Sequence, residues 1–216
     1  MQTPHDVVAE MERTGVVAVV RADSSEQLIE VVAALHQGGL TCIEITMTTP
    51  NALEVIRAAG KEFKGKCVIG AGTVLDSETA RAAILAGAEY VVSPILDLET
   101  IALCKRYGKA VIPGAFTPTE ILRAWQAGAD LVKVFPATKL GPEFFQDIRG
   151  PLPQVRLTPT GGVTLKNTGD FIRAGAVCVG VGGAMVTKKA VAEKDYATLT
   201  ANAAAFLKAV ADARTM

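Results

Sequence analysis

Eight short runs of apolar, mostly β-branched residues recur along the chain at a nearly regular interval. Their first residues are 20 to 26 positions apart, which leaves room for one helix and two short loops between successive runs. The runs are almost continuously apolar rather than alternating, as expected of strands buried on both faces of a parallel sheet. They are VVAVVR (16–21), CIEITM (42–47), VIGAGT (68–73), YVVSP (90–94), AVIPG (110–114), LVKVFP (131–136), RLTPTG (156–161) and CVGVGG (178–183).

The segments between these runs carry signals for the start and the end of helices. Thr117 precedes Pro118 and lies three residues before Glu120, a capping-box pattern with proline at the first helical position. Ser24 and Gln27 have the same spacing at the start of an earlier segment. In AILAGAEYVV, AWQAGADLVKV and IRAGAVCVGV, a glycine ends the helix just before the next strand. The sequence therefore predicts that strands and helices alternate throughout.

Eight such units within 216 residues predict an α/β fold, a single (β/α)8 TIM barrel domain over residues 1–216. An open, doubly wound sheet is the alternative that periodicity leaves open, and the count of eight favours the barrel. The segment HDVVAEMERTG (5–15) has an amphipathic pattern, and we expect an extra N-terminal helix across the barrel bottom. We expect the last helix over residues 195–213.

The composition disfavours several classes of function. The 22 basic and 22 acidic residues give a formal net charge of zero, which argues against a nucleic-acid or anionic-membrane partner. The four cysteines form no CxxC pair and only two histidines are present, so we expect no metal site and no cofactor. Reduced thiols and the absence of a signal-peptide pattern predict a cytoplasmic protein.

Two charged residues interrupt the apolar runs. Lys133 lies in LVKVFP and Glu44 in CIEITM, each between apolar neighbours. Because neighbouring side chains of a strand point to opposite faces, both charges face the barrel interior if their neighbours face the helices. Both lie near mid-strand, so we expect them just below the mouth at the carboxyl ends of the strands, where the active sites of this fold lie.

A purely structural interpretation of these two charges is a buried ion pair. Such a pair gives little net stability, because desolvation offsets much of the attraction. The functional interpretation is that a desolvated lysine has a lowered pKa and becomes a nucleophilic amine, which can form a Schiff base with a carbonyl group. A nearby carboxylate can transfer protons for it. We therefore expect Lys133 and Glu44 to form a catalytic pair.

Glycine pairs follow the last two predicted strands. Gly161 and Gly162 lie in TPTGGV, and Gly182 and Gly183 lie in VGVGGAM. The loops after strands seven and eight form the usual phosphate site of TIM barrels, with backbone N–H groups and a helix N-terminus as donors. Tight turns alone would also favour glycine. Because two pairs occur at the two expected strand ends, we expect a phosphate or similar anion there.

Other strand ends carry candidate ligand-binding residues. Arg21 ends the first run, and Thr73 ends the third, in GAGTV, where the glycines would let a ligand approach the backbone closely. The Thr73 hydroxyl could instead cap the next helix. Pro94 and Pro136 would stiffen the rim of the mouth. Phe135 would form an apolar wall beside the lysine or contribute to the core.

Several of these motifs together resemble the aldolases that cleave 2-keto-3-deoxy-6-phosphogluconate (KDPG) and 4-hydroxy-2-oxoglutarate (KHG). A closely related branch acts on the 6-phosphogalactonate epimer. The resemblance extends in order from about residue 16 to residue 185. Its motifs are IEIT (43–46), GAGTV (70–74), SP (93–94), PG (113–114), LVKVFPA (131–137) and PTGG (159–162).

The resemblance implies a Schiff-base aldolase that needs no cofactor and forms a homotrimer. By this resemblance Lys133 matches the lysine that forms the imine and Glu44 the general acid/base. Thr73 matches a contact to the pyruvate end, and Arg21 a contact to an anionic end. The two glycine pairs match the phosphate-binding turns, and the residues expected to bind substrate are Arg21, Thr73, Pro94, Phe135, Thr160, Gly161, Gly162, Gly182 and Gly183.

The sequence departs from the family pattern at one position. Many members carry an arginine four residues after the glutamate, where it holds the substrate carboxylate, and this chain has Thr48 there. We therefore assign the carboxylate to Arg21 and Thr73. Two alternatives stay open from the residues alone, namely a phosphate-binding isomerase or epimerase without an imine, and a non-catalytic barrel that only binds a ligand.

Overall fold

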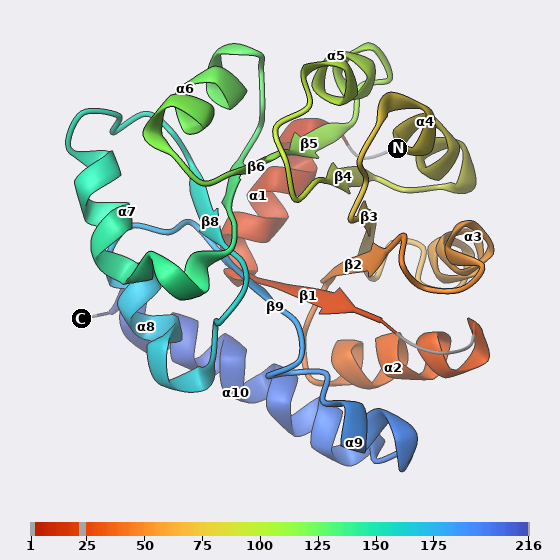
Figure 1. Cartoon of the computed structure of the whole chain (residues 1–216). Helices are drawn as coiled ribbons and strands as arrows, with labels where there is room; N and C mark the ends of the chain where they lie inside the picture. Colours follow the sequence, from red (N-terminus) through yellow and green to blue (C-terminus); the bar gives the residue numbers. More distant parts are fainter. Residues whose placement is uncertain (1–2, 22–24, 216) are drawn as a thin grey trace.

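The computed structural model describes residues 3–21 and 25–215, and strands and helices alternate in it as the sequence predicts (Figure 1). The strands are β1 (Val16–Val20), β2 (Cys42–Thr46), β3 (Val68–Gly72), β4 (Tyr90–Val92), β5 (Ala110–Ile112), β6 (Gly114–Ala115), β7 (Val132–Val134), β8 (Leu157–Pro159) and β9 (Val179–Val181). The helices are α1 (Pro4–Thr14), α2 (Ser25–Gln37), α3 (Ala52–Glu62), α4 (Ser77–Ala86), α5 (Leu98–Arg106), α6 (Pro118–Gln126), α7 (Gly141–Arg149), α8 (Leu165–Arg173), α9 (Lys188–Ala192) and α10 (Tyr196–Arg214), with a 3₁₀ turn at Ala137–Lys139.

The strands close into a parallel barrel. One set runs in the order β5-β4-β3-β2-β1-β9 and the other in the order β6-β7-β8. The sets meet at two places. The chain passes from β5 through Pro113 into β6, and β8 joins β9 through the bridge between Thr160 and Gly180. The TIM barrel expected from the sequence is thereby confirmed, and the open sheet is excluded.

The fifth predicted strand is divided, which the sequence analysis did not anticipate. Pro113 separates β5 from β6, because proline has no N–H to donate to a neighbouring strand. Its carbonyl still accepts a hydrogen bond from the Lys133 N–H at 2.9 Å. The other predicted runs are longer than the observed strands by one to three residues. Their last residues belong to the loops at the mouth, and the three runs for β7, β8 and β9 also begin one residue before the strand.

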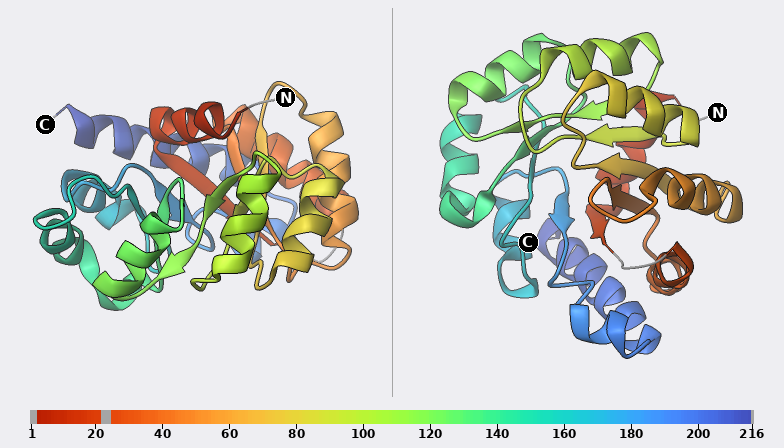
Figure 2. Two further views of the ribbon diagram at one scale, coloured as in Figure 1. Left: turned by 90° about the horizontal axis from the view of Figure 1, so that it is seen from above. Right: turned by 45° about the vertical axis from the view of Figure 1, so that its right-hand side comes forward.

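The expected N-terminal helix closes the bottom of the barrel. Val7, Val8 and Met11 of α1 are fully or almost fully buried and join the side chains that fill the lower interior, among them Tyr90 and Cys178. Figure 2 (left) shows α1 across the end opposite the mouth. The sequence specifies this helix with a capping box at Thr3 and a left-handed glycine at its end.

The helix signals read from the sequence are confirmed where the structure describes them. Thr117 accepts a hydrogen bond from the Glu120 N–H in a capping box, with Pro118 as the first residue of α6. Asp76, rather than Thr73, caps α4 by accepting the Thr79 N–H at 2.6 Å. The predicted cap Ser24 lies outside the described residues.

Candidate active site

Lys133 and Glu44 occupy the centres of β7 and β2. Their side chains are 5% and 3% exposed, although each could carry a full charge. Val132 and Val134, the neighbours of Lys133, pack into the apolar layer between barrel and helices. As the two-residue period of a strand requires, Lys133 and Glu44 therefore point into the barrel, where both line one small internal space.

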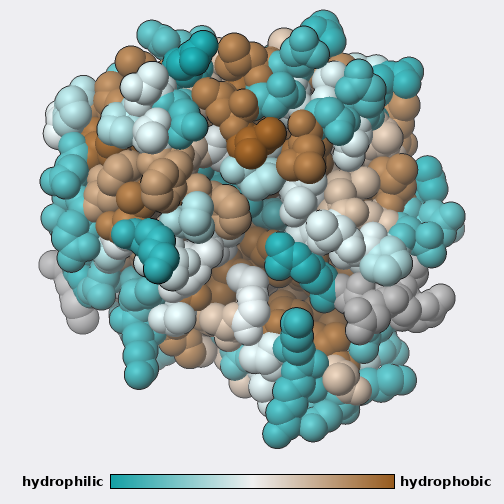
Figure 3. All heavy atoms as spheres, viewed as in Figure 1, coloured by the Kyte–Doolittle hydropathy of each residue, from teal (hydrophilic) through white to brown (hydrophobic). Residues whose placement is uncertain are grey.

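A cavity of about 380 Å³ lies above this space at the mouth of the barrel. Figure 3 shows the same face hollowed near its centre. Lys133 lines the floor of the cavity. Every residue expected to bind substrate lines it too, namely Arg21, Thr73, Pro94, Phe135, Thr160, Gly161, Gly162, Gly182 and Gly183.

Glu44 is the one predicted site residue outside the mouth cavity. It lies beneath it, in the small space that it shares with Lys133, Thr158 and Thr160. That space measures about 10 Å³, which is close to the room that one water molecule needs. A carboxylate in this position can exchange protons with a group at Lys133 directly or across one water molecule.

The charges of the two residues are not neutralised by a direct ion pair. Among the described residues neither makes a salt bridge, and Glu44 Oε1 has no hydrogen-bond partner. Burial raises the pKa of the Glu44 carboxyl, and the positive charges of Lys133 and Arg21 oppose part of that shift. The ammonium of Lys133 lies 5.0 Å from the centre of the Phe135 ring, within the range of a cation–π contact. A structural ion pair therefore does not explain these two residues.

Two glycines of β3 make room for neighbouring side chains inside the barrel. A Cβ on Gly72 would lie 1.9 Å from Glu44 Oε1, and a Cβ on Gly70 would lie 2.3 Å from the Tyr90 ring. Both approaches are far shorter than a van der Waals contact. From the sequence we expected these glycines to let a ligand approach the backbone. The structure corrects this expectation, because the side chains of Glu44 and Tyr90 occupy the space that the glycines leave.

The two glycine pairs differ in their backbone, because Gly161 and Gly162 have positive φ and Gly182 and Gly183 do not. Gly161 and Gly162 have φ of 88° and 74°, the left-handed region that favours glycine. They lead into α8, whose first turn is capped by Thr164. Gly183 has no heavy atom within 4 Å of a would-be Cβ, so its lack of a side chain leaves open space in the cavity. Thr73 also has positive φ, 59°, which is unusual for a residue other than glycine.

Some residues of the cavity were missed from the sequence. Val19 and Gly180 line it from β1 and β9, and Val163, Thr164 and Ala184 line it from the loops beside the glycine pairs. Strand alternation could have found Val19, which lies two residues before Arg21. The loop residues carry no comparable signal, because their orientation depends on how the loops fold.

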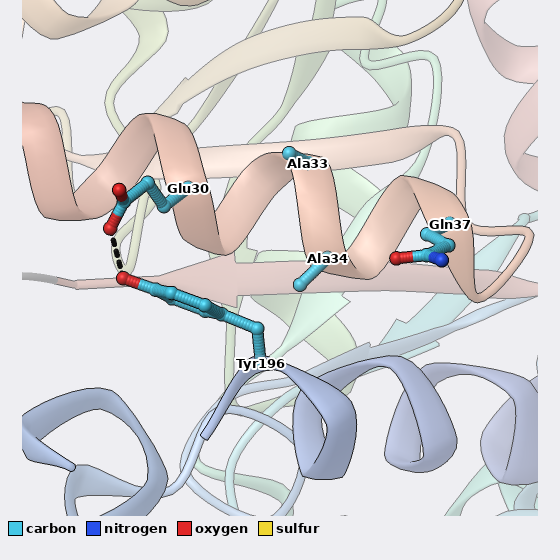
Figure 4. Close-up of a pocket in the computed structure, with 5 residues that line it drawn as sticks. All are labelled: Glu30, Ala33, Ala34, Gln37 and Tyr196. Carbon is cyan, nitrogen blue, oxygen red and sulfur yellow. Dashed lines mark hydrogen bonds between the residues drawn. The ribbon is translucent and has the colours of Figure 1, made fainter. Parts of the chain in front are cut away.

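A separate surface hollow of about 290 Å³ lies between α2 and α10 (Figure 4). The Tyr196 hydroxyl donates a hydrogen bond to Glu30 there, so these two polar groups satisfy each other. None of the predicted site residues lines this hollow. In the described part of the chain no helix is long and apolar enough to cross a membrane, and no three His, Cys, Asp or Glu side chains gather as metal ligands would.

Comparison with known proteins identifies relatives over most of the chain. A family model described as KDPG and KHG aldolase matches residues 7–202. A 2-dehydro-3-deoxy-phosphogluconate aldolase of Treponema pallidum is 37% identical over 192 residues, covering 88% of this chain and 91% of the relative. A 2-dehydro-3-deoxy-6-phosphogalactonate aldolase of Escherichia coli is 31% identical over 198 residues, covering 91% of this chain and 95% of the relative.

A solved structure of the same family superposes on this chain. A KDPG aldolase from Legionella pneumophila, with pyruvate captured as a covalent carbinolamine, superposes with a TM-score of 0.87 at 28% identity and covers 95% of this chain and 98% of that one. The family match extends over most of the chain, including β1 to β9 and every predicted site residue. The chain belongs to the KDPG and KHG aldolase family, and it is an aldolase, a carbon–carbon lyase.

Proposed function

We propose that this protein is a Schiff-base aldolase that cleaves 2-dehydro-3-deoxy-6-phosphogluconate to pyruvate and glyceraldehyde 3-phosphate. Lys133 is the observation that carries the proposal. It is a 5% exposed amine without an ion pair among the described residues, and it lies on the floor of a cavity large enough for a small keto acid. A buried, unpaired amine is a costly feature that imine chemistry explains.

The reaction begins at the C2 ketone of the substrate. The neutral amine of Lys133 adds to C2, and the protonated Glu44 carboxyl supplies the proton with which the C2 hydroxyl leaves as water, so that a protonated imine and the Glu44 carboxylate remain. The C4 hydroxyl gives its proton to the Glu44 carboxylate, and the electrons of the C3–C4 bond move into the imine, which becomes an enamine. Glyceraldehyde 3-phosphate leaves. Glu44 returns the proton to C3, and water hydrolyses the imine to release pyruvate and the free lysine.

The geometry of Glu44 fits a proton carrier. Burial raises the pKa of its carboxyl, so the group keeps its proton to higher pH than an exposed glutamate does. It shares an internal space with Lys133 and lies beneath the mouth cavity rather than in its lining. The acid/base group therefore does not compete with the substrate for room in the mouth.

The two ends of the substrate are assigned to different residues of the mouth cavity. The phosphate is held by the turns at Gly161–Gly162 and Gly182–Gly183, where exposed backbone and the start of α8 favour an anion. The carboxylate of the pyruvate half is assigned to Arg21 and Thr73, because Thr48 replaces the arginine of many members. Pro94, Phe135 and Thr160 form further walls of the cavity.

The 6-phosphogalactonate epimer is a second candidate substrate, and KHG is a third. Relatives named for the gluconate and for the galactonate substrate are similarly distant, at 37% and 31% identity for the two described above, and another relative named as a probable galactonate-type aldolase is 37% identical. These candidates share the imine and differ at C4 or in the phosphate. The family assignment argues against the isomerase and the non-catalytic barrel.

Borohydride trapping tests the proposal. The protein is incubated with pyruvate and sodium borohydride, weighed as an intact chain, and mapped by peptide. A reduced pyruvate adduct at Lys133 that is absent from the Lys133→Met variant and present in the Lys139→Met control would support the imine. Folded wild-type protein without an adduct would refute it. Initial rates with the three substrates then rank them.

We also propose a cytoplasmic homotrimer built from this single barrel domain. Four exposed apolar side chains lie on the loops and the helix start that follow the neighbouring strands β3, β4 and β6, namely Leu75, Ile95, Leu98 and Phe116. Brown side chains gather on the upper part of the face in Figure 3. A second copy would cover such a patch. The four cysteines are free and buried, as is usual in a reducing compartment. Sedimentation equilibrium of wild type and Leu98→Glu tests the assembly.

A further inference from the structure

A second cavity, larger than the first, opens beside the active-site cavity. It measures about 570 Å³ and lies between the ends of β1 and β2 and helix α9. Val19, Arg21 and Gly183 line both cavities. Because the two cavities share these lining residues, they lie side by side at the mouth, and the second is within reach of a molecule bound at Lys133. We call the second cavity the side chamber.

Two cations line the side chamber. They are Arg21 and Lys188, and no acidic residue is found among the described residues of its lining. Both cations are exposed, and within the residues that the structure describes neither makes an ion pair or a hydrogen bond. Since Arg21 is assigned to the carboxylate of pyruvate, Lys188 is the cation left for a second negative group, and a carboxylate or phosphate would form a charge-assisted hydrogen bond with it.

The remaining walls of the side chamber are mainly apolar. Val186, Val191 and Ala192 form one side beside Lys188, and Pro50 lies on the other. They would pack against a short hydrocarbon chain. A ligand that contacts both the apolar walls and the cation at Lys188 has an apolar stem and an anionic end.

Thr48 keeps the side chamber open. Its hydroxyl lies 2.9 Å from that of Thr46, so the short side chain is held by its own strand end. Thr49 is buried next to it. A long side chain at position 48 would extend into the chamber volume. Because this chain has Thr48 where many family members have an arginine, space is left beside the reacting carbons.

We propose that the side chamber is a second subsite for the aldehyde half of the reaction. It takes aldehydes with a short apolar stem and a terminal carboxylate or phosphate, and Lys188 binds that terminus. This inference rests on the proposed function. In the direction of synthesis, C3 of the Lys133-bound pyruvate enamine forms a bond to the aldehyde carbon, and the aldehyde oxygen receives a proton from Glu44. Water then releases a 4-hydroxy-2-oxo acid with a second anionic end.

A matched acceptor panel tests the side chamber. Addition of pyruvate to 5-oxopentanoate is compared with addition to pentanal, which has the same stem without the charge, and to D-glyceraldehyde 3-phosphate. The variants are Lys188→Met, Lys188→Glu and Ala192→Phe, which fills the chamber from α9. Lys189→Met is the control, because Lys189 is an exposed neighbour in α9 that does not line the chamber.

Wild-type protein should prefer 5-oxopentanoate to pentanal by about tenfold in kcat/KM, as expected for one charge-assisted hydrogen bond at the lower end of its range. Lys188→Met should abolish that preference through KM, and Lys188→Glu should reverse it. Ala192→Phe should lower kcat/KM for both 5-oxopentanoate and pentanal. Lys189→Met should leave every ratio unchanged, and rates with glyceraldehyde 3-phosphate should stay within twofold in all variants.

Two results overturn the inference and differ in what else they refute. Equal use of the two long acceptors by wild type, or equal ratios in the Lys188 and Lys189 variants, refutes the side chamber alone, provided that pyruvate and borohydride still modify Lys133. Absence of that adduct in folded protein refutes the proposed function, and the subsite with it.

Discussion

Replacing Gly72 with alanine should displace the Glu44 carboxylate while leaving Lys133 in place. The added Cβ would lie 1.9 Å from Oε1 and 2.5 Å from both Cδ and Cγ of Glu44. The backbone conformation does not oppose the change, since Gly72 does not have positive φ. The perturbation is therefore steric, and it acts on one side chain at the centre of the proposed mechanism.

The size of the effect follows from the overlap. Contacts below 3.0 Å are essentially never found for a real Cβ, so Glu44 or the strand must shift by about 1 Å. A misplacement of this size lowers catalysis by about 10²-fold. Overpacking a filled interior costs about 1–3 kcal/mol in the free energy of unfolding, and Glu44 is only 3% exposed.

The assay separates chemistry from imine formation. Steady-state cleavage is followed by enzymatic reduction of the released pyruvate, and borohydride trapping with pyruvate reports Lys133. Gly72→Ala should lower kcat about 10²-fold and still give the adduct. Gly60→Ala is the matched control. Gly60 lies in α3 with its nearest atom 3.9 Å from a would-be Cβ, so this change should leave kcat alone and add about 0.5–1 kcal/mol of stability.

A double variant sharpens the test. If the loss in Gly72→Ala is due to displacement of Glu44, adding Gly72→Ala to Glu44→Gln should cost little further activity, because the two changes remove one function. Full additivity of the two losses, or a kcat in Gly72→Ala within threefold of wild type, would refute the reasoning.

Three further predictions concern the interior and a helix cap. Glu44→Gln should lower kcat by about 10²–10⁴-fold. Because burial raises the pKa of this carboxyl, the folded state keeps the proton to higher pH than the unfolded chain, so wild-type stability should decline as pH rises from the ordinary value of 4.5 to the raised one. Urea unfolding of both proteins from pH 4.5 upward should show the decline in wild type only. Tyr90→Phe should keep or raise stability by up to about 1–2 kcal/mol, since the buried hydroxyl has no hydrogen-bond partner among the described residues, and a calorimetric loss above 1 kcal/mol would contradict this. Thr117→Ala should cost about 1 kcal/mol by removing the cap of α6, with Thr117→Ser as the variant that restores it in thermal unfolding.

The glycines of the GAGTV motif show a limit of prediction from the sequence, because the need for glycine was predicted correctly and the group that requires it was not. Their need for space was recognised, but the groups that fill it, Glu44 and Tyr90, come from neighbouring strands. Position along one strand predicts which face a side chain takes. It does not predict which side chain of a neighbouring strand lies at the same level in the barrel, because that depends on the register between strands.

The sequence by itself determined the repeating strand–helix units, the inward direction of Lys133 and Glu44, and the loops that carry Arg21, Thr73 and the glycine pairs. These follow from local periods and capping signals that act over a few residues. Only the tertiary structure decided that Pro113 divides a strand, that Glu44 lies beneath the mouth cavity, and that α9 and Thr48 enclose a side chamber. Each of these depends on the closure of the barrel, which brings together segments far apart in the chain, and no local pattern encodes the distances that result.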